Sequence, residues 1–347
     1  MNMIKYLSPF APDISGAVSV LFELGSLIVI CDAGGCTGNV CGFDEPRWFQ
    51  KKSAIFSAGL RDMDAILGCD ERLITKLQDA VSKIDAAFTA IIGTPVPAVI
   101  GTDFRALKRM AEKRTGLPAI TIETSGTSLY DEGEESAMLK LFQGFATEGF
   151  PVKRGTVGVL GVTPLEFSSL QAGELMASAV EHSGLGRAVC YGMGRGLDSV
   201  QHASAAEKNL VVSPAGLKTA KYLRSTFGTP YTIGCPLISK NLKEKLTGLA
   251  GKRVLVIHQQ ILANSVRNRI LDSVDADVTV ASWFMLKDDL KQKGDFRLTD
   301  ERQFAAAVED GGYNVVIGDS FLKRALRHYY GQFIDFPHFA VSGRLEE

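Results

Sequence analysis

Residues 26–49, SLIVICDAGGCTGNVCGFDEPRWF, join a short apolar run to a glycine-rich segment that holds half of the six cysteines of the chain. Cys31, Cys36 and Cys41 follow one another at steps of five residues. Such a step turns an α-helix by about 500°, so the three cysteines do not share one helical face. The glycines between and around them permit the backbone angles of a tight turn. We therefore expect a buried strand that leads into a loop on which the thiols converge.

Short apolar runs alternate with amphipathic segments along the whole chain, a pattern typical of βαβ units and parallel sheets. Nearly all of the apolar runs are continuous, as expected for strands covered on both faces. Helices are predicted between them, and residues 103–116 begin with an Asp cap and end at a glycine. The predicted strands are 27–31, 87–93, 119–124, 156–162, 188–192, 210–213, 231–234, 253–258, 277–283 and 314–319.

The alternation is interrupted at residues 125–136, which are polar and glycine-rich, and at residues 243–252, which precede a new strand. A chain of 347 residues is long enough for two or three compact units. We expect an α/β fold of three Rossmann-like βα units with parallel sheets, at residues 1–150, 151–250 and 251–347.

Composition excludes several classes of partner. The net charge is −1 and basic residues occur only in short pieces, which argues against a nucleic-acid partner. No apolar stretch approaches the roughly 20 residues of a membrane helix, and the first residues contain no signal-peptide pattern. We expect a cytoplasmic protein, and in that compartment clustered cysteines typically bind metal or carry out redox chemistry.

Other motifs give weaker signals. No phosphate loop of the form G-x-x-x-x-G-K-[ST] occurs, and in GMGRGLDS (192–199) Leu197 replaces the third glycine of a dinucleotide fingerprint. That segment favours a tight strand–helix turn over a nucleotide site. The five histidines are scattered, so none is assigned a ligand role. Residues 318–331, GDSFLKRALRHYYG, predict a basic amphipathic helix with a solvated face.

The cysteine spacing by itself leaves two interpretations open. Loops of this kind hold iron–sulfur clusters through thiolates, but this is not the C-x-x-C ladder of ferredoxins, and three thiols leave a four-iron cluster one ligand short. The alternative is three cysteines in a tight turn that bind no metal. Cys190 lies within a predicted buried strand and Cys235 follows another, so neither is expected to bind iron.

The cysteine segment resembles the strand and loop of the nitrogenase component 1 superfamily, in which an H-G-P-x-G-C segment carries a cluster ligand. Gly35 and Cys36 match its G-C, and Cys31 stands in place of its histidine. Residues 57–73 resemble the segment ending in F-G-G-D-x-x-L, with Cys69 in place of the second glycine. Residues 91–107, 206–231 and 251–257 resemble further motifs in the same order. This order identifies the chain as a member of the superfamily.

Departures from the pattern limit what the resemblance implies. No cysteine occurs near Phe10 or Ala11, where the family has its first cluster ligand, and Pro95 replaces a second family cysteine. Ser213 stands where the catalytic subunit of nitrogenase has the cysteine that holds its large cofactor, and we find no counterpart of that subunit's C-terminal histidine ligand. The resemblance therefore implies an iron–sulfur cluster, expected to be [4Fe-4S], and no molybdenum cofactor.

The resemblance assigns Cys36 as a metal ligand, with Cys31, Cys41 and Cys69 as the other candidates and Gly34 and Gly35 beside the cluster. Two chains that each supply two thiolates would complete a cluster, which implies a homodimer. Which cysteine accompanies Cys36 stays open at this point.

The function implied is that of a nitrogenase-like oxidoreductase subunit. It would receive electrons from an ATP-hydrolysing iron protein and reduce a small molecule in a cleft among the three units. The alternatives are a non-catalytic scaffold for assembly of a metal cluster or cofactor, and a plain small-molecule-binding protein. The sequence assigns no catalytic residue.

Overall fold

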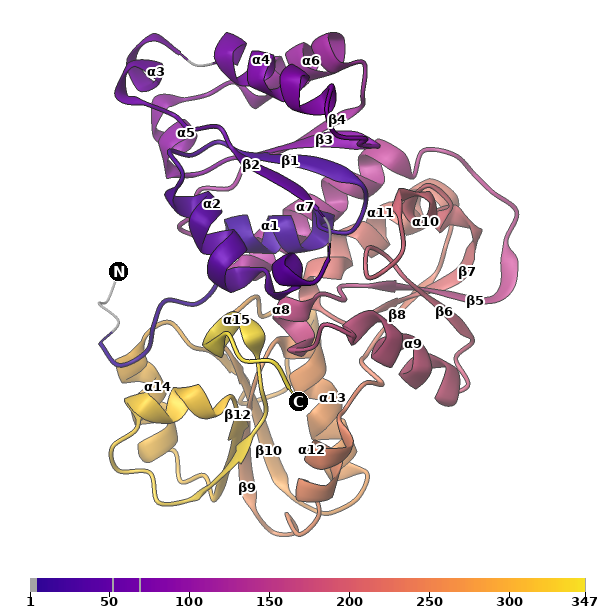
Figure 1. Cartoon of the computed structure of the whole chain (residues 1–347). Helices are drawn as coiled ribbons and strands as arrows, with labels where there is room; N and C mark the ends of the chain where they lie inside the picture. Colours follow the sequence, from indigo (N-terminus) through magenta and orange to yellow (C-terminus); the bar gives the residue numbers. More distant parts are fainter. Residues whose placement is uncertain (1–4, 52, 69, 347) are drawn as a thin grey trace.

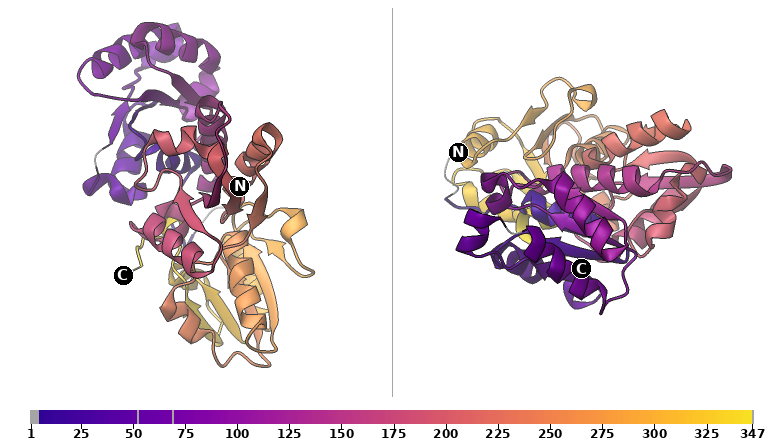
Figure 2. Two further views of the ribbon diagram at one scale, coloured as in Figure 1. Left: turned by 90° about the vertical axis from the view of Figure 1, so that its right-hand side faces the viewer. Right: turned by 90° about the horizontal axis from the view of Figure 1, so that it is seen from above.

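The computed structural model describes residues 5–51, 53–68 and 70–346, and within them the strands form three sheets (Figure 1). Every strand pair in these sheets is parallel, which confirms the predicted α/β class. Each sheet lies in its own lobe, and the side view in Figure 2 places the first and third lobes at opposite ends. The division of the chain into three domains stays a prediction.

The first sheet has the strand order β2-β1-β3-β4. Its central strands are buried along their whole length, as their continuous apolar sequence predicted. The strands are β1 (Ser26–Ile30), β2 (Ala54–Ser57), β3 (Phe88–Ile92) and β4 (Ala119–Ile122); the helices are α1 (Asp13–Leu21), α2 (Gly35–Asn39), η1 (Val40–Asp44), η2 (Pro46–Phe49), α3 (Asp62–Leu67), α4 (Asp70–Val81), α5 (Pro95–Ile100), α6 (Phe104–Thr115) and α7 (Tyr130–Phe145).

The second sheet has the order β6-β5-β7-β8. In Figure 1, α10 and α11 lie above this sheet and α9 lies below it. The strands are β5 (Lys153–Leu160), β6 (Arg187–Cys190), β7 (Ala206–Val211) and β8 (Tyr231–Ile233); the helices are α8 (Pro164–Phe167), α9 (Ala172–His182), α10 (Leu197–Gln201), η3 (Ala203–Ala205), η4 (Pro214–Gly216) and α11 (Leu217–Phe227).

The third sheet has the order β11-β10-β9-β12-β13. Its strands are β9 (Arg253–Ile257), β10 (Asp277–Ser282), β11 (Phe296–Arg297), β12 (Val315–Gly318) and β13 (Gln332–Asp335); the helices are α12 (Lys240–Lys245), α13 (Gln260–Leu271), η5 (Asp288–Leu290), α14 (Glu301–Glu309), η6 (Ser320–Ala325) and α15 (Phe339–Ser342). No helix of the described residues is long and apolar enough to cross a membrane.

Helices α1 and α7 cross in direct backbone contact near the middle of the molecule. A Cβ atom on Gly16 of α1 would lie 1.9 Å from the carbonyl oxygen of Tyr130, and one on Gly133 of α7 would lie 1.8 Å from that of Asp13. Only glycine fits at either position, because real Cβ atoms do not approach backbone so closely. The two glycines therefore fix how α7 enters the region where the three sheets meet.

The sequence missed three strands and predicted a helix where there is only a short 3₁₀ segment. Strands β2, β11 and β13 are short and lie at the sheet edges, where half-exposed side chains break the apolar pattern. Residues 318–331, predicted as a helix, contain only the 3₁₀ segment η6 before the chain extends into β13. Phe321, Leu322 and Ala325 pack against the third sheet, so tertiary contacts override the helical periodicity. The predicted Asp cap of α6 is confirmed, because Asp103 Oδ1 accepts from the backbone of Arg105 and Ala106.

Candidate functional site

The segment after β1 is helical, not the open loop that the sequence predicted. Gly34 has a φ of 118°, which a residue with a side chain rarely adopts, and it turns the chain into α2. Gly35 is the first residue of α2, which contains Cys36, and the wider π turn η1 contains Cys41. The glycines thus begin a helix, and the cysteines follow along it.

Two aspartates hold this helical segment in place. Asp32 accepts hydrogen bonds from the Thr37 amide at 2.8 Å and the Thr37 hydroxyl at 3.0 Å, which caps the first turn of α2. Asp44, at the end of η1, accepts from the Ser15 hydroxyl at 2.7 Å and the Asn39 amide at 2.6 Å. The segment is therefore tied both to β1 and to α1.

A buried ion pair supports the chain just beyond Cys41. Arg47 of η2 is fully buried, with its Nε 2.7 Å from Glu45 Oε1 and its Nη1 3.2 Å from Glu23 Oε2. Its Nη2 also donates to the backbone oxygen of Ser19 on α1, at 2.6 Å. The η1–η2 connection is consequently fixed against α1 by charge-assisted hydrogen bonds.

Cys36 and Cys41 are both partly buried, and neither forms a disulfide. Burial raises the pKa of the Cys36 thiol, and the charge of Asp32 raises it further. Burial and the charges of Glu45 and Asp32 likewise raise the pKa of Cys41. Both thiols therefore stay protonated at neutral pH, unlike nucleophilic cysteines, whose pKa is lowered. A metal cation that binds the two sulfur atoms must displace the thiol protons. The negative charges of Asp32 and Glu45 favour a cation at this place.

The other cysteines lie elsewhere. Cys31 is buried in the core cluster that includes Leu73 of α4 and Leu107 of α6, whereas Cys36 and Cys41 pack against the cluster that includes α1 and α7. Cys31 and the Cys36–Cys41 pair thus belong to different faces of the first sheet. Cys190 is buried, as its place in a predicted buried strand indicated, and Cys235 is buried as well. The candidate ligand Cys69 lies outside the described residues, and within the described chain no three His, Cys, Asp or Glu side chains are grouped closely enough to hold a metal ion.

A second polar cluster is buried where α7, α8 and the third sheet meet. Glu134 of α7 and Glu166 of α8 are fully buried and form a hydrogen bond between their carboxyl groups, which requires that one carries a proton. The Thr163 hydroxyl donates to Glu134 Oε1 at 2.6 Å. Glu134 Oε2 has no donor among the described residues.

Three further side chains, from α7 and from the segments before η4 and α15, complete this carboxyl cluster. The Tyr130 hydroxyl donates to Glu166 Oε2 at 2.9 Å, and the Ser213 hydroxyl donates to Glu166 Oε1. Nε2 of His338 lies 2.9 Å from the Tyr130 oxygen. Since the single Tyr130 proton points to Glu166, the His338 tautomer with a protonated Nε2 completes the chain. A continuous hydrogen-bonded path therefore runs from the third sheet through Tyr130 to the carboxyl pair.

Burial keeps this cluster nearly uncharged. It raises the pKa of Glu166 to about 8 and the pKa of Glu134 well above its ordinary value. Burial also lowers the pKa of His258 to about 3 and that of His338 well below its ordinary value. The two imidazoles stack at a centroid distance of 4.0 Å and remain neutral. The cluster can thus hold an exchangeable proton in a dry region.

The sequence did not identify this cluster. Its members lie up to 208 residues apart and match no motif, and His258 and His338 were assigned no role. The sequence did carry one signal for the cluster. Glu166, Ser213 and His258 each follow a parallel strand, and the carboxyl ends of parallel strands are where α/β folds usually place functional residues. Ser213, the counterpart of a cofactor-binding cysteine, is fully buried against Glu166. A hydroxyl in this packing does not provide the thiolate that the large cofactor would need.

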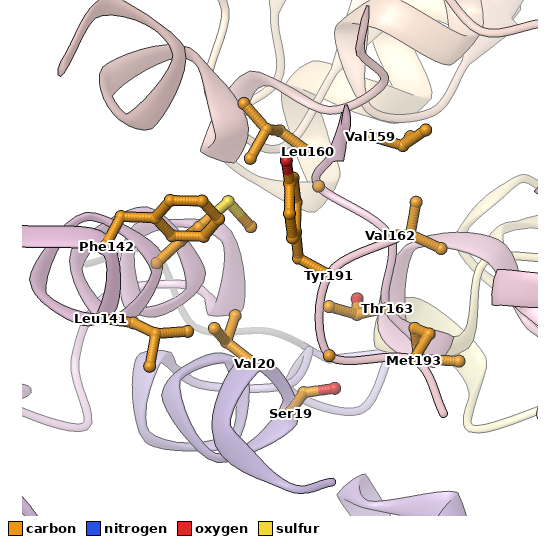
Figure 3. A pocket seen from close by; sticks show the side chains of 13 residues that line it. Ser19, Val20, Leu141, Phe142, Val159, Leu160, Val162, Thr163, Tyr191 and Met193 are labelled. Atoms are coloured by element: carbon orange, nitrogen blue, oxygen red, sulfur yellow. The ribbon is translucent and has the colours of Figure 1, made fainter. Parts of the chain in front are cut away.

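A small cavity lies beside Thr163, between α1, α7 and the turn after β6 (Figure 3). Its volume is about 10 Å³, which is close to the minimum for a single water molecule. Tyr191 and Phe142, which meet edge to face at 5.0 Å, form part of its wall. This cavity is too small for an organic substrate, so in this conformation a small molecule does not reach the carboxyl pair through it.

Sequence comparison supports the class of protein that the fold and the cysteine segment suggest. The family of nitrogenase component 1 type oxidoreductases matches residues 14–237, from the start of α1 to beyond β8. This match covers more than half of the chain, and the chain therefore belongs to that family.

Individual relatives agree with this assignment. The nitrogenase iron-molybdenum cofactor biosynthesis protein NifE of Klebsiella pneumoniae is 29% identical over 235 residues, which are 60% of this chain and 50% of NifE. The match thus spans half the length of that relative. The solved structure of nitrogenase Cp1 at pH 6.5 has a TM-score of 0.73 at 11% identity, over 97% of this chain and 87% of its own. Nitrogenase Cp1 at pH 5 has a TM-score of 0.68 at 14% identity, over 92% of this chain and 81% of its own. These structures confirm the fold.

Proposed function

We propose that this chain is an iron–sulfur subunit of a nitrogenase-like reductase. It receives electrons from an ATP-hydrolysing iron protein and passes them to a small molecule. The observation that carries this proposal is the pair of partly buried thiols, Cys36 and Cys41, on one helical segment at the carboxyl edge of a parallel sheet. Carboxyl edges of parallel strands are the usual functional edge of α/β folds.

The donor set fits half of a four-thiolate cluster. Cys36 and Cys41 supply two thiolates from each chain, and a two-fold dimer supplies four, the number that a [4Fe-4S] cluster takes. Such a cluster, when bound, stores and transfers single electrons. Gly34 and Gly35 lie at the start of the segment, where the absence of side chains leaves room beside Cys36. Cys31 is the weaker candidate because it faces α4 and α6.

The surface around the thiols supports a homodimer. Phe43 of η1 and Phe49 of η2 are 75% and 78% exposed, and Val99 of α5 is 85% exposed. Figure 1 shows α2 and α5 at the same end of the first sheet. Exposed large apolar side chains on and next to a ligand-bearing segment, as with Phe43 and Phe49, are typical of a surface that another protein covers. The occupant we propose is a second copy, because it also brings the two missing thiolates.

The buried carboxyl pair favours a reductase over an electron carrier. Reduction of a multiple bond consumes protons as well as electrons. Glu134 and Glu166 hold a proton in a dry region, with the neutral His338 linked to them through Tyr130. A group that releases a proton near pH 8 is suited to general acid catalysis at neutral pH.

The second candidate function is a non-catalytic scaffold on which a metal cluster or cofactor is assembled. The similarity to NifE favours it, because NifE is named as a cofactor biosynthesis protein. In that case the chain would bind a cluster and exchange it with other proteins, and it would show no turnover of its own.

The test combines iron content with turnover. Protein prepared without oxygen is assayed for iron and sulfide, for thiolate-to-iron absorption near about 400 nm, and for oxidation of a reductant when an iron protein and ATP are present. We expect iron in the wild type and in Cys190→Ala, and no iron in Cys36→Ala. ATP-dependent reduction of an added substrate supports the reductase. Bound iron without turnover supports the scaffold, and iron-free wild-type protein contradicts both.

A further inference from the structure

A groove of about 280 Å³ lies on the second sheet, between α10 and the strands β5 and β6. It is separate from the cysteine segment and from the carboxyl pair. Its floor includes Thr156 of β5 and Val189 of β6. The strand register places Val189 opposite Gly158, and alternation along β6 puts Arg187 and Val189 on the same face. The groove is thus built on a rigid, paired part of the sheet.

Three cationic side chains line this groove without a counterion. Lys153, Arg187 and Arg195 form no side-chain hydrogen bond or ion pair with any part of the chain that the structure describes. The acidic lining residue, Asp198, already contacts His202, with its Oδ1 3.0 Å from Nδ1. The groove therefore presents a net positive field, which concentrates anions.

An unpaired buried amide, that of Asn209, lies next to the groove behind the Tyr191 hydroxyl. Tyr191 lines the inner end of the groove, and its hydroxyl lies 2.3 Å from the position that a Cβ atom on Gly158 would take. Oδ1 of Asn209, on β7, lies at the same distance from that point. Asn209 is fully buried, and neither its Oδ1 nor its Nδ2 has a hydrogen-bond partner among the described residues. Buried amides are rarely left unpaired, so this one indicates a ligand or a ligand-bound water.

We propose that this groove binds a small anion that carries a phosphate or carboxylate group. Guanidinium groups bind both through paired hydrogen bonds, so Arg187 and Arg195 would hold the anionic end. The Tyr191 hydroxyl and the Asn209 amide would meet a polar group at the inner end. The glycine-rich turn at residues 192–196, which matched no complete nucleotide motif, places Arg195 at the groove. This proposal is independent of iron binding.

The test measures binding of inorganic phosphate and of succinate by isothermal titration calorimetry. We expect saturable binding of at least one of them, weakened by added salt. The double variant Arg187→Gln/Arg195→Gln should weaken binding by about tenfold or more, the loss that a missing charge-assisted hydrogen bond brings. Tyr191→Phe, which removes only the hydroxyl, should weaken it several-fold.

Arg269→Gln is the matched control, because Arg269 is an exposed arginine at the end of α13. Binding of phosphate alone identifies a phosphate site, and binding of succinate alone identifies a carboxylate site. If neither anion binds the wild type, or if the double variant binds as tightly as Arg269→Gln, the proposal is wrong. Circular dichroism of the variants checks that each one is folded.

Discussion

The carboxyl groups of Glu134 and Glu166 are hydrogen-bonded to each other in a fully buried position, although α7 and α8 belong to different parts of the chain. Two ionised carboxylates at this distance in a dry site would repel each other strongly. The protein therefore keeps a proton between them, and Tyr130, Ser213 and Thr163 donate to the oxygens that remain.

The first prediction concerns pH and stability. The pKa of Glu166 rises from 4.5 to about 8 on folding, so between these values the folded chain retains a proton that the unfolded chain has lost. The contribution of Glu166 to the free energy of unfolding is therefore fully present below about pH 4.5 and is lost as the pH rises towards about 8. Glu166→Gln should flatten this decline, because its amide donates to Glu134 without titrating. Urea unfolding from pH 5 to pH 9 measures the effect.

Glu134 and Asp131 on α7 also have raised pKa values, so part of the decline should remain in Glu166→Gln. The buried His338, whose pKa is lowered, acts in the opposite direction, because the unfolded chain binds a proton there that the folded chain excludes. Glu181→Gln, an exposed change of the same kind on α9, is the control and should leave the pH profile unchanged. A Glu166→Gln profile that coincides with that of the wild type would show that the pair carries no shared proton.

The second prediction concerns the metal ligands. In anaerobic preparations, Cys36→Ala and Cys41→Ala should each lose the bound iron, because a two-thiolate half-site has no spare ligand. Cys31→Ala should retain the iron, since Cys31 packs against α4 and α6. Cys190→Ala serves as the buried-cysteine control. Iron and acid-labile sulfide per chain are the measurements, and retention of wild-type iron by Cys36→Ala would refute the assignment.

Cys69→Ala belongs in the same series because the sequence names Cys69 as a fourth candidate ligand. Loss of iron in Cys69→Ala together with a monomeric wild type would place the cluster within one chain.

The third prediction concerns oligomeric state. Phe43→Ser should shift the protein from dimer to monomer in analytical ultracentrifugation, because it removes an apolar side chain that is 75% exposed beside Cys41. Tyr330→Ser is the matched control, since Tyr330 is 90% exposed before β13, far along the chain from the thiols. A wild type that sediments as a monomer with a complete cluster would be incompatible with the shared-cluster dimer.

The fourth prediction concerns the ion pair that supports the cysteine segment. Arg47→Met leaves Glu45 buried without its partner and should lower the free energy of unfolding by about 3–5 kcal/mol. Arg114→Met, which breaks an exposed pair with Glu71 at 2.8 Å, should cost less than about 1 kcal/mol. Denaturant unfolding of both variants compares the two. Equal losses would mean that the buried pair is not what holds η2 against α1.

Strands could be predicted where burial on both faces makes the sequence continuously apolar, as in β1, β3 and β9. The cap of α6 was readable because Asp103 bonds only to its own chain neighbours. Edge strands such as β13 were missed, since half-exposed positions carry no strong pattern. The conformation of residues 35–44 was mistaken because Asp32 and Asp44, through contacts to Thr37 and Ser15, favour a helix that glycine content alone does not indicate.

The sequence by itself determined the parallel α/β architecture, the family and the position of Cys36 on the strand-exit segment. These properties follow from local periodicity and from the order of motifs along the chain. Only the tertiary structure decided that Cys31 faces away from Cys41, and that Glu134, Glu166 and His338 form one buried cluster. The physical reason is that burial and proton sharing depend on which elements pack together in space, and residues far apart in sequence carry no local signal of that packing.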